Sequence, residues 1–236
     1  MTTPAAQPEH ADAVARARAY DAWFDHGWGA YAQRVERAAL LAALGEIAGQ
    51  RVLDIGCGTG RFTRALEEAG AHVTGVDVDT AALAIAAGRV DGPLVHADAH
   101  GLPFADDAFD LAVTITATEF LTDPALALDE AVRVTRPGGR LLVAALNPVS
   151  PWGLAHRREF RDPPWDDACL RKPAELDALT AGLGRVEAHA ALYAPAALPG
   201  LRHVGPLLER IGRLAPGLAA FQIRLIHVPV GIHTGH

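Results

Sequence analysis

The sequence has little cysteine and no long apolar run, and each shortage excludes a class of protein. Cys57 and Cys169 are the two cysteines among 236 residues, which is too few for a disulfide framework, and neither belongs to a metal-spaced pair such as CxxC. No apolar run reaches the roughly 18 residues of a membrane span, and residues 1–9 lack the blocks of a signal peptide. We therefore expect a cytoplasmic protein with no metal site and no membrane span.

Basic charge is scarce relative to acidic charge. The formal net charge is -7 at pH 7 and the sequence pI is about 5.8. Such a field repels phosphate backbones, whereas nucleic-acid-binding proteins usually present a basic face. Nucleic acid is therefore not expected as a partner. The length and a hydrophobic share of 50% fit a single domain spanning residues 1–236, as a monomer or homodimer.

The sequence does contain a regular alternation of short apolar runs and helical patterns. Apolar residues recur at helical spacing through residues 9–44, and Gly27 and Gly29 interrupt them, which predicts two helices. Asp123 is the predicted N-cap of a later helix that has Pro124 at its first position. Strands are predicted at 51–55, 72–77, 94–97, 109–116, 140–146, 186–193 and 220–227, and further helices at 62–69, 81–87, 123–134, 174–181 and within 195–216. This alternation is typical of an α/β fold with a parallel sheet covered by helices on both faces.

The first predicted strand ends in glycines at alternate positions. Residues 52–60 read VLDIGCGTG, with Gly56, Gly58 and Gly60 before a helix. Glycine is required where a backbone turns tightly or a ligand lies against it. The dinucleotide fingerprint is G-x-G-x-x-G, whereas the spacing here is G-x-G-x-G. Asp54 adds negative charge where a pyrophosphate would sit, so a ligand with an ammonium group is favoured.

Two more acidic residues follow the next two predicted strands. Asp77 ends the strand at 72–77, where a carboxylate can accept hydrogen bonds from both ribose hydroxyls of a nucleoside. Asp98 follows the third strand and can accept from an adenine amino group. Each carboxylate alone is better explained as a solvated side chain or an N-cap than as a ligand-binding group. Because the carboxyl ends of parallel strands share one edge, the set predicts a nucleoside site there.

The residues just described, with two further blocks, resemble a known family. The blocks are 97–110, ADAHGLPFADDAFD, and 136–142, RPGGRLL. Together they resemble the class I S-adenosylmethionine (SAM)-dependent methyltransferases, in the methyltransferase type 11 group that includes the ubiquinone/menaquinone-biosynthesis enzymes. The resemblance implies a Rossmann-like, mostly parallel sheet of seven strands with the last strand antiparallel. It divides the chain into an N-terminal helical lid at 1–48, a SAM-binding core at 50–147, and substrate-side insertions with the last strands at 148–236.

The resemblance also implies roles for individual residues. SAM and its product S-adenosylhomocysteine are expected to lie across the ends of the first, second and fourth strands. The methionine part would approach the glycines, the ribose would bind Asp77, and Asp98 and Ala99 would frame the adenine. The full set of implied cofactor residues is Asp54, Gly56, Cys57, Gly58, Gly60, Asp77, Val78, Asp98, Ala99 and Thr116. Cys57 is interpreted as a small residue of the turn rather than a reactive thiol.

Methyl transfer from SAM needs no protein nucleophile, because positioning and the exclusion of water supply most of the catalysis. A general base is needed only where the acceptor loses a proton, and the candidates are Glu119, His156 and Tyr20. The family's usual His after the fourth strand is missing, since residues 116–120 read TATEF. Aromatic residues gather before the first strand and after the fifth, and they predict an acceptor pocket for a small molecule formed by Tyr20, Trp23, Trp28 and Trp152. The same aromatics equally fit packing of the N-terminal helices onto the domain.

Two other functions remain open from the sequence. A non-catalytic SAM-binding or sensing module would use the same cofactor residues, because a fold does not fix a function. An NAD(P)-dependent oxidoreductase is disfavoured by the glycine spacing and by the lack of a Tyr-x-x-x-Lys pair. Cofactor preference separates the oxidoreductase from the other two, and turnover separates the enzyme from the sensor.

Overall fold

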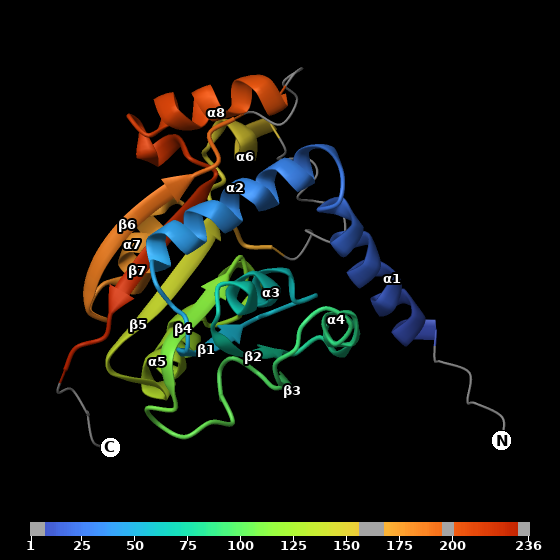
Figure 1. Ribbon diagram of the computed structural model, residues 1–236, viewed down its shortest axis with the longest axis vertical. Coiled ribbons are helices and arrows are strands. Elements are labelled where there is room, and N and C mark those ends of the chain that lie inside the picture. Colours follow the sequence, from blue (N-terminus) through green and yellow to red (C-terminus); the bar gives the residue numbers. More distant parts are fainter. Residues whose placement is uncertain (1–7, 156–167, 195–200, 231–236) are drawn as a thin grey trace.

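A seven-stranded sheet forms the centre of the molecule (Figure 1). The computed structural model describes residues 8–155, 168–194 and 201–230. The strand order is β3-β2-β1-β4-β5-β7-β6. β1 to β5 pair in parallel, and β7 is antiparallel to both of its neighbours. The strands are β1 (Arg51–Ile55), β2 (His72–Asp77), β3 (Leu94–His96), β4 (Phe109–Ile115), β5 (Thr135–Leu146), β6 (Arg185–Ala191) and β7 (Phe221–His227). The predicted α/β class, with its antiparallel last strand, is confirmed.

Helices cover both faces of the sheet. The helices are α1 (Pro8–Trp23), α2 (Gly27–Leu44), α3 (Arg61–Glu68), α4 (Thr80–Ala86), α5 (Pro124–Val134), α6 (Pro151–Ala155), α7 (Pro173–Thr180) and α8 (Leu201–Gly212), with short 3₁₀ turns η1 (Thr118–Phe120) and η3 (Pro216–Leu218). Leu40 and Leu44 of α2 pack on one face, and Leu128 of α5 and Leu176 of α7 pack on the other. None of the helices in the described ranges is both long and apolar enough to cross a bilayer.

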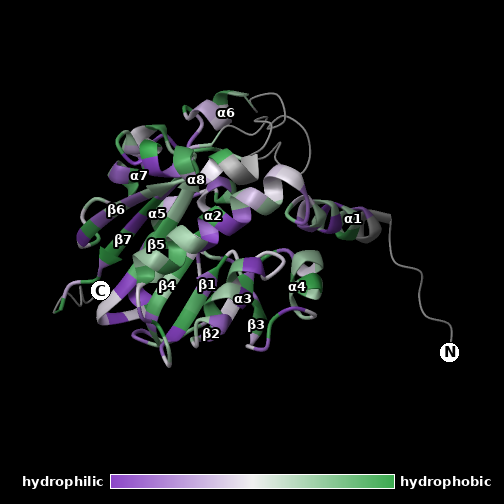
Figure 2. Cartoon of the chain, turned by 45° about the horizontal axis from the view of Figure 1, so that its top comes forward, coloured by the Kyte–Doolittle hydropathy of each residue, from purple (hydrophilic) through white to green (hydrophobic). Residues whose placement is uncertain are grey.

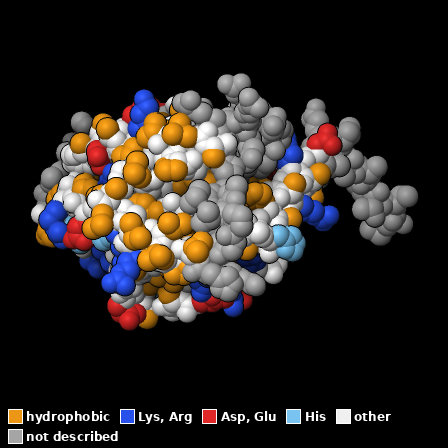
Figure 3. Space-filling model, turned by 90° about the horizontal axis from the view of Figure 1, so that it is seen from above, with side chains coloured by type: hydrophobic (Ala, Val, Ile, Leu, Met, Phe, Trp, Pro, Cys, Tyr) orange, Lys and Arg blue, Asp and Glu red, His pale blue; other side chains and the backbone are white. Residues whose placement is uncertain are grey.

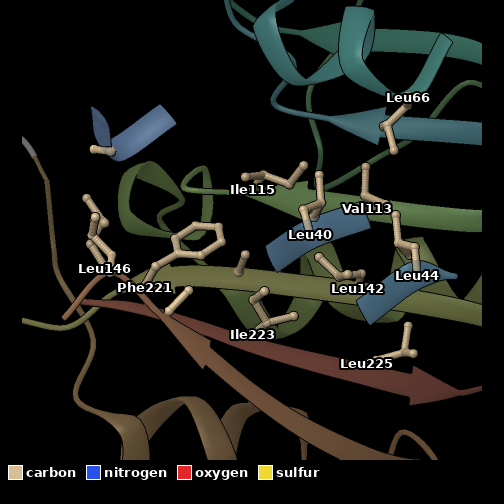
Figure 4. Packing of buried hydrophobic residues seen from close by; sticks show 14 of the residues in the cluster. Leu40, Leu44, Leu66, Val113, Ile115, Leu142, Leu146, Phe221, Ile223 and Leu225 are labelled. Carbon is tan, nitrogen blue, oxygen red and sulfur yellow. The ribbon is translucent and has the colours of Figure 1, made fainter. Parts of the chain in front are cut away.

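The alternation of side chains along the strands creates two hydrophobic clusters. In β1, Val52 belongs to the cluster beneath α2 while its neighbour Leu53 belongs to the cluster beneath α5. Successive side chains of a strand point to opposite faces, so a strand buried on both faces is apolar throughout. The central strands are accordingly hydrophobic along much of their length (Figure 2). Figure 4 shows the α2 side, where Leu40 and Leu44 face Val113 and Leu142.

The structure places most elements close to their predicted bounds and corrects two details. Gly27 has a positive φ of 53° and begins α2, whereas Gly29 lies inside that helix. A Cβ at Gly29 would lie 2.0 Å from the backbone oxygen of Trp23. This glycine therefore allows α1 and α2 to pack closely and does not interrupt the helix. β5 begins at Thr135 rather than at residue 140, because Thr135 pairs with Phe109 across an irregularity in the register. The division of the chain into lid, core and substrate-side parts stays a prediction.

Candidate cofactor and acceptor site

The glycine loop at the end of β1 is held by the end of β2. The amides of Gly56 and Cys57 both donate to the carbonyl oxygen of Val76, at 2.8 and 3.0 Å. The amide of Gly58 donates to Oδ2 of Asp77 at 2.7 Å. Asp77 therefore fixes the loop as well as facing the cavity beside it. Burial raises the pKa of the Cys57 thiol above its usual range, which agrees with a packing role for that residue.

The three glycines of the loop serve different purposes. All have a positive φ, at 73°, 54° and 79° for Gly56, Gly58 and Gly60, a conformation that L side chains rarely adopt. A Cβ at Gly56 would lie 2.4 Å from Cβ of Ala117, and one at Gly60 would lie 2.9 Å from Cγ1 of Val90. A Cβ at Gly58 would meet nothing within 4 Å. Gly58 thus leaves open space in front of the loop, while the other two permit close packing.

A cavity of about 590 Å³ opens at this loop, along the carboxyl ends of β1, β2 and β4. Of the predicted cofactor residues, Gly60 does not line it, because Gly60 faces Ala86 and Val90 behind the loop. Every other predicted cofactor residue lines the cavity: Asp54, Gly56, Cys57, Gly58, Asp77, Val78, Asp98, Ala99 and Thr116. Residues far apart in the sequence are thereby brought together at one edge of the sheet, as expected for ligand sites in this architecture.

Asp54 is a buried acid at the inner end of the cavity. Its side chain is 1% exposed, and Oδ2 accepts a hydrogen bond from Oγ1 of Thr63 at 2.6 Å. Burial, with the charge of nearby Asp77, raises the pKa of Asp54 to about 7 although Thr63 opposes the shift. A cation placed beside this carboxyl group would favour its ionised form. The α-ammonium group of SAM fits that requirement.

The part of the cavity at the ends of β2 and β3 suits a nucleoside. The carboxylate of Asp77 accepts from the amides of Gly58 and Asp79, and its remaining lone pairs are available for ribose hydroxyls. Val78 is 67% exposed although it is apolar, and it lines the cavity with Asp98. Asp98 accepts from the backbone amide and Nδ1 of His100, which lowers its pKa. An exposed apolar surface next to a carboxylate fits an adenine ring with its amino group.

α1 forms the roof of the cavity through Ala13, Ala17 and Tyr20, together with Phe24 directly after the helix, and it packs beside α4 (Figure 1). Its position is fixed by Asp21, whose carboxylate accepts from side chains of the loop and beyond. The donors are Oγ1 of Thr59 and Nε of Arg61, both at 2.7 Å, and Nη1 and Nη2 of Arg89 at 2.8 Å. Although burial opposes ionisation, the bonds from Arg89 and Arg61 hold the pKa of Asp21 well below its usual range.

Arg61, the first residue of α3, ties three segments of the N-terminal part together. Its Nη2 donates to the backbone oxygen of Asp21 at 2.6 Å and to Oδ1 of Asp25 at 2.7 Å. Its Nη1 donates to Oε1 of Gln33 in α2 at 3.1 Å. The guanidinium also lies 5.3 Å from the ring centroid of Phe24. The glycine loop and its roof are therefore one connected unit.

The three candidate bases lie in different places. Tyr20 lines the cavity, its hydroxyl is hydrogen-bonded with Thr116, and burial raises its pKa above the usual range. Glu119 is 2% exposed and does not line the cavity. Its carboxylate instead accepts hydrogen bonds from the amide of Leu146 at 2.8 Å and from Oγ1 of Thr118 at 3.0 Å. Glu119 thus links the end of β5 to η1. His156 lies outside the described residues.

The tryptophans predicted for the acceptor pocket pack next to it instead. Trp152 is 6% exposed in the cluster beneath α2, and Trp23 and Trp28 pack against the same cluster. None of the three lines the cavity, so of the predicted pocket residues Tyr20 alone does. The ring of Trp28 stacks on Tyr31 with centroids 5.3 Å apart. The alternative interpretation, in which the aromatics hold the N-terminal helices, describes these tryptophans.

Other side chains form the apolar wall. Phe24 is one of the N-terminal aromatic residues from which the acceptor pocket was predicted, whereas Phe62, Phe120 and Leu121 were not predicted to lie there. Phe24, Phe62, Phe120 and Leu121 line the cavity. Phe120 is 45% exposed in η1, directly after the end of β4. Its place in a loop after a parallel strand was the available signal, since ligands in such folds bind at these loops.

Glu36 was also missed, although its sequence position is informative. It lies on the buried face of α2 between Ala32 and Leu40, at helical spacing among apolar residues. Burial, followed by the charge of Glu119, raises its pKa to about 8. Its charge also contributes to the raised pKa of Tyr20, so this acid acts electrostatically on the cavity wall.

Known proteins match the central part of this chain. Residues 53–143 match the methyltransferase domain family. The demethylmenaquinone methyltransferase of Clavibacter sepedonicus is 42% identical over 112 residues, which make up 45% of this chain and 45% of that protein. The malonyl-[acyl-carrier protein] O-methyltransferase of Erwinia billingiae is 39% identical over 106 residues, or 42% of this chain and 40% of that protein. The chain thus spans about half the length of the curated relatives it matches.

The fold also has a counterpart among solved structures. A SAM-dependent methyltransferase from Thermotoga maritima, described as a possible histamine N-methyltransferase, has a TM-score of 0.72 and 24% identity, covering 91% of this chain and 97% of that one. At this identity the likeness concerns the fold alone. The family inferred from the glycine loop is confirmed by the family match. Residues 53–143 therefore match the methyltransferase domain family, and the cavity at the glycine loop is suited to its cofactor SAM.

Proposed function

We propose that this protein transfers the methyl group of SAM to a small, largely apolar acceptor. The observation that carries the proposal is the continuity of one cavity. Its polar part contains Asp54, Gly58 and Asp77, and its apolar part contains Phe24 and Phe120. The curated relatives, named for a demethylmenaquinone and a malonyl-[acyl-carrier protein] substrate, support methyl transfer and differ in the acceptor.

When bound, SAM supplies a methyl group on a positively charged sulfur. An electron pair of the acceptor would take this methyl group, and the sulfur would keep the electron pair of the broken carbon–sulfur bond as S-adenosylhomocysteine. A proton lost by the acceptor would pass to solvent water. Asp54 would hold the ammonium group, Asp77 the ribose, and the roof made by α1 would exclude water. Orientation of this kind contributes on the order of 7 kcal/mol in favourable cases.

Tyr20 is proposed to orient the acceptor rather than to take its proton. Its hydroxyl is hydrogen-bonded with Thr116 at the end of β4, and its raised pKa keeps it protonated near neutral pH. Thr116 has a φ of 50°, a strained conformation for a residue other than glycine, and such strain is concentrated at functional sites.

The wall of the cavity favours an aromatic acceptor over a charged one. Phe24, Phe120 and Leu121 offer apolar surface, and aromatic faces bury aromatic rings favourably. The cations at the cavity are Arg61, which is already bound to Asp21 and Asp25, and the exposed Arg16. We therefore propose a quinol-like ring as the acceptor class, in preference to a malonyl carboxylate.

The test is calorimetric titration of the purified protein with SAM, S-adenosylhomocysteine and NADH, repeated on Asp77→Ala. Both adenosyl ligands should bind, and the variant should lose about tenfold or more in affinity, because hydrogen bonds to a charged group are each worth about 1.5–3 kcal/mol. Asp91→Ala is the matched control, since Asp91 is exposed and pairs with Arg64 away from the cavity. Binding of NADH without the adenosyl ligands would overturn the proposal.

Turnover is measured separately as formation of S-adenosylhomocysteine with a demethylated naphthoquinol or a malonyl thioester as acceptor. We expect product with the quinol. SAM binding without turnover on either class would favour the sensing module, and turnover on the thioester alone would overturn the proposed acceptor class.

A further inference from the structure

An exposed apolar stripe runs along α8 and the turn that follows it. Val204, Leu207 and Ile211 follow one another at steps of three and four residues, which places them on one side of α8, and Leu214 and Leu218 continue the row in the turn and in η3. The stripe consists of Val204, Leu207, Ile211, Leu214 and Leu218, which are 38%, 57%, 54%, 88% and 53% exposed. Single exposed apolar residues are ordinary, but a contiguous row of them marks an interaction surface.

Contacts on the inner side of α8 hold the helix in an orientation that leaves this stripe exposed to solvent. Leu208 packs on the cluster beneath α2. Glu209 accepts from the hydroxyl of Tyr31 at 3.2 Å and from the amides of Leu192 and Tyr193 at 3.0 and 2.9 Å. A Cβ at Gly205 would lie 2.6 Å from the Tyr31 hydroxyl oxygen. The helix therefore cannot rotate to bury the stripe without breaking these contacts.

The described charged side chains that α8 and its turn expose are positive, in contrast to the net charge of -7 for the chain. Arg210 and Arg213 are exposed, and neither forms an ion pair with another described residue. Glu209, the acid of α8, points inward as described above. The outer side of α8 thus combines apolar side chains with arginine and, within the described residues, carries no acid.

α8 lies at the same edge of the sheet as the cavity. It follows β6, which runs parallel to β1–β5, and it precedes β7, which runs in the opposite direction. The end of β6 and the start of β7 are therefore at the carboxyl edge, where the glycine loop and Phe120 also lie. Figure 3 looks onto this end of the molecule and shows hydrophobic side chains gathered there.

We infer that the α8 stripe docks this protein on an anionic lipid bilayer, with the helix lying in the plane of the membrane surface. An apolar face flanked by arginines is the composition of interfacial helices, which gain affinity from both buried apolar area and anionic lipid. A second copy of the chain fits less well. In a two-fold contact the same surface meets itself, so Arg210 and Arg213 would face arginines without an acid on α8 to pair with.

The experiment is co-sedimentation of the full chain with vesicles of phosphatidylcholine containing about 30% phosphatidylglycerol, and with vesicles of phosphatidylcholine alone. Binding should require the anionic lipid and weaken as salt rises. The triple variant Leu207→Ser, Ile211→Ser, Leu214→Ser should lose about tenfold or more in partition coefficient, because apolar burial provides much of the affinity. These side chains are exposed, so the variant should unfold at the same temperature as the native chain.

Two controls make the result decisive. Leu126→Ser removes a 46% exposed leucine of α5 and should leave vesicle binding unchanged. Arg210→Gln with Arg213→Gln should remove the preference for anionic vesicles, whereas Arg185→Gln on β6 should not. Failure of the native chain to bind anionic vesicles, or equal binding by the triple variant, overturns the inference. A native dimer that the triple variant converts to monomer would overturn it in favour of a second copy.

Discussion

Asp54 is a buried acid whose ionised form the ammonium group of the cofactor would stabilise. Without a ligand, burial raises its pKa to about 7, so protons compete with an ammonium group for this carboxylate. We expect the affinity for SAM to rise from pH 5.5 to pH 7, by up to about tenfold per pH unit, because fewer sites must lose a proton before binding. Calorimetry at pH 5.5, 6.25 and 7 measures this slope. Asp54→Asn should bind weakly and without the slope; equal affinity of the native protein across the range would contradict the assignment.

Glu36 should lower the stability of the protein above neutral pH. Its pKa is about 8 in the folded state, raised by burial and by Glu119 from an ordinary value of 4.5. A folded state that holds the proton more tightly is favoured at low pH, so this stabilisation is present below about pH 4.5 and is lost as the pH rises toward 8. The difference is on the order of a few kcal/mol.

Glu36→Gln should therefore be more stable than the native chain at pH 8.5, with a smaller loss of unfolding free energy between pH 6 and pH 8.5. Urea unfolding of both proteins at pH 6 and pH 8.5 measures this loss of unfolding free energy. Glu46→Gln is the control, because Glu46 is exposed at the end of α2. A native chain that gains stability over the same pH interval would show that Glu36 is not buried as described.

At the scale of elements, the position of α1 depends on one carboxylate. Removing it in Asp21→Ala leaves Arg61 and Arg89 without their shared partner, and breaking a partly buried ion network is costly. We expect the affinity for S-adenosylhomocysteine to fall by about tenfold or more and the amides of α1 to exchange faster with deuterium, since the roof would detach from the glycine loop.

Asp25→Ala provides the comparison for this prediction. Asp25 also pairs with Arg61, but its side chain is 52% exposed, so its ion pair should contribute little. Amide exchange by mass spectrometry and calorimetry on both variants give the result. If Asp21→Ala bound the ligand as tightly as the native chain, with α1 equally protected, the roof would not depend on this contact.

Elements with a local cause were predictable from the sequence. The helix that begins after Asp123 follows from an N-cap, which accepts from the amide of Leu126 at 3.1 Å, and from a proline at the first position. β5 begins earlier than its apolar run because its first residues pair with β4, and pairing between distant segments has no local signal. Gly29 was misinterpreted for the same reason, because its neighbour is the backbone of another helix.

At the scale of the whole molecule, the cofactor half of the site was predictable and the acceptor half was not. The glycine loop, Asp77 and Asp98 lie at the ends of consecutive strands, so their convergence follows from the fold class. The acceptor wall depends on how α1, Phe24 and η1 come together around the cavity, which composition does not specify. The tryptophans were expected there because they are aromatic, yet the packing turned Phe24 and Phe120 to the cavity and the tryptophans toward the core.

The placement of β7 has a consequence for how the chain is made. β6 joins the sheet through β7, which lies between β5 and β6. A ribosome delivers β7 after both of its neighbours, so a nascent chain that ends before Phe221 can pair five strands but must leave the edge of β5 open. During that interval the apolar side chains of Leu142 and Ala144 lack the cover that Ile223 and Leu225 later provide. Synthesis of β7 therefore closes the sheet, and a chain stalled before Phe221 would present an unpaired strand edge to chaperones and to its own copies.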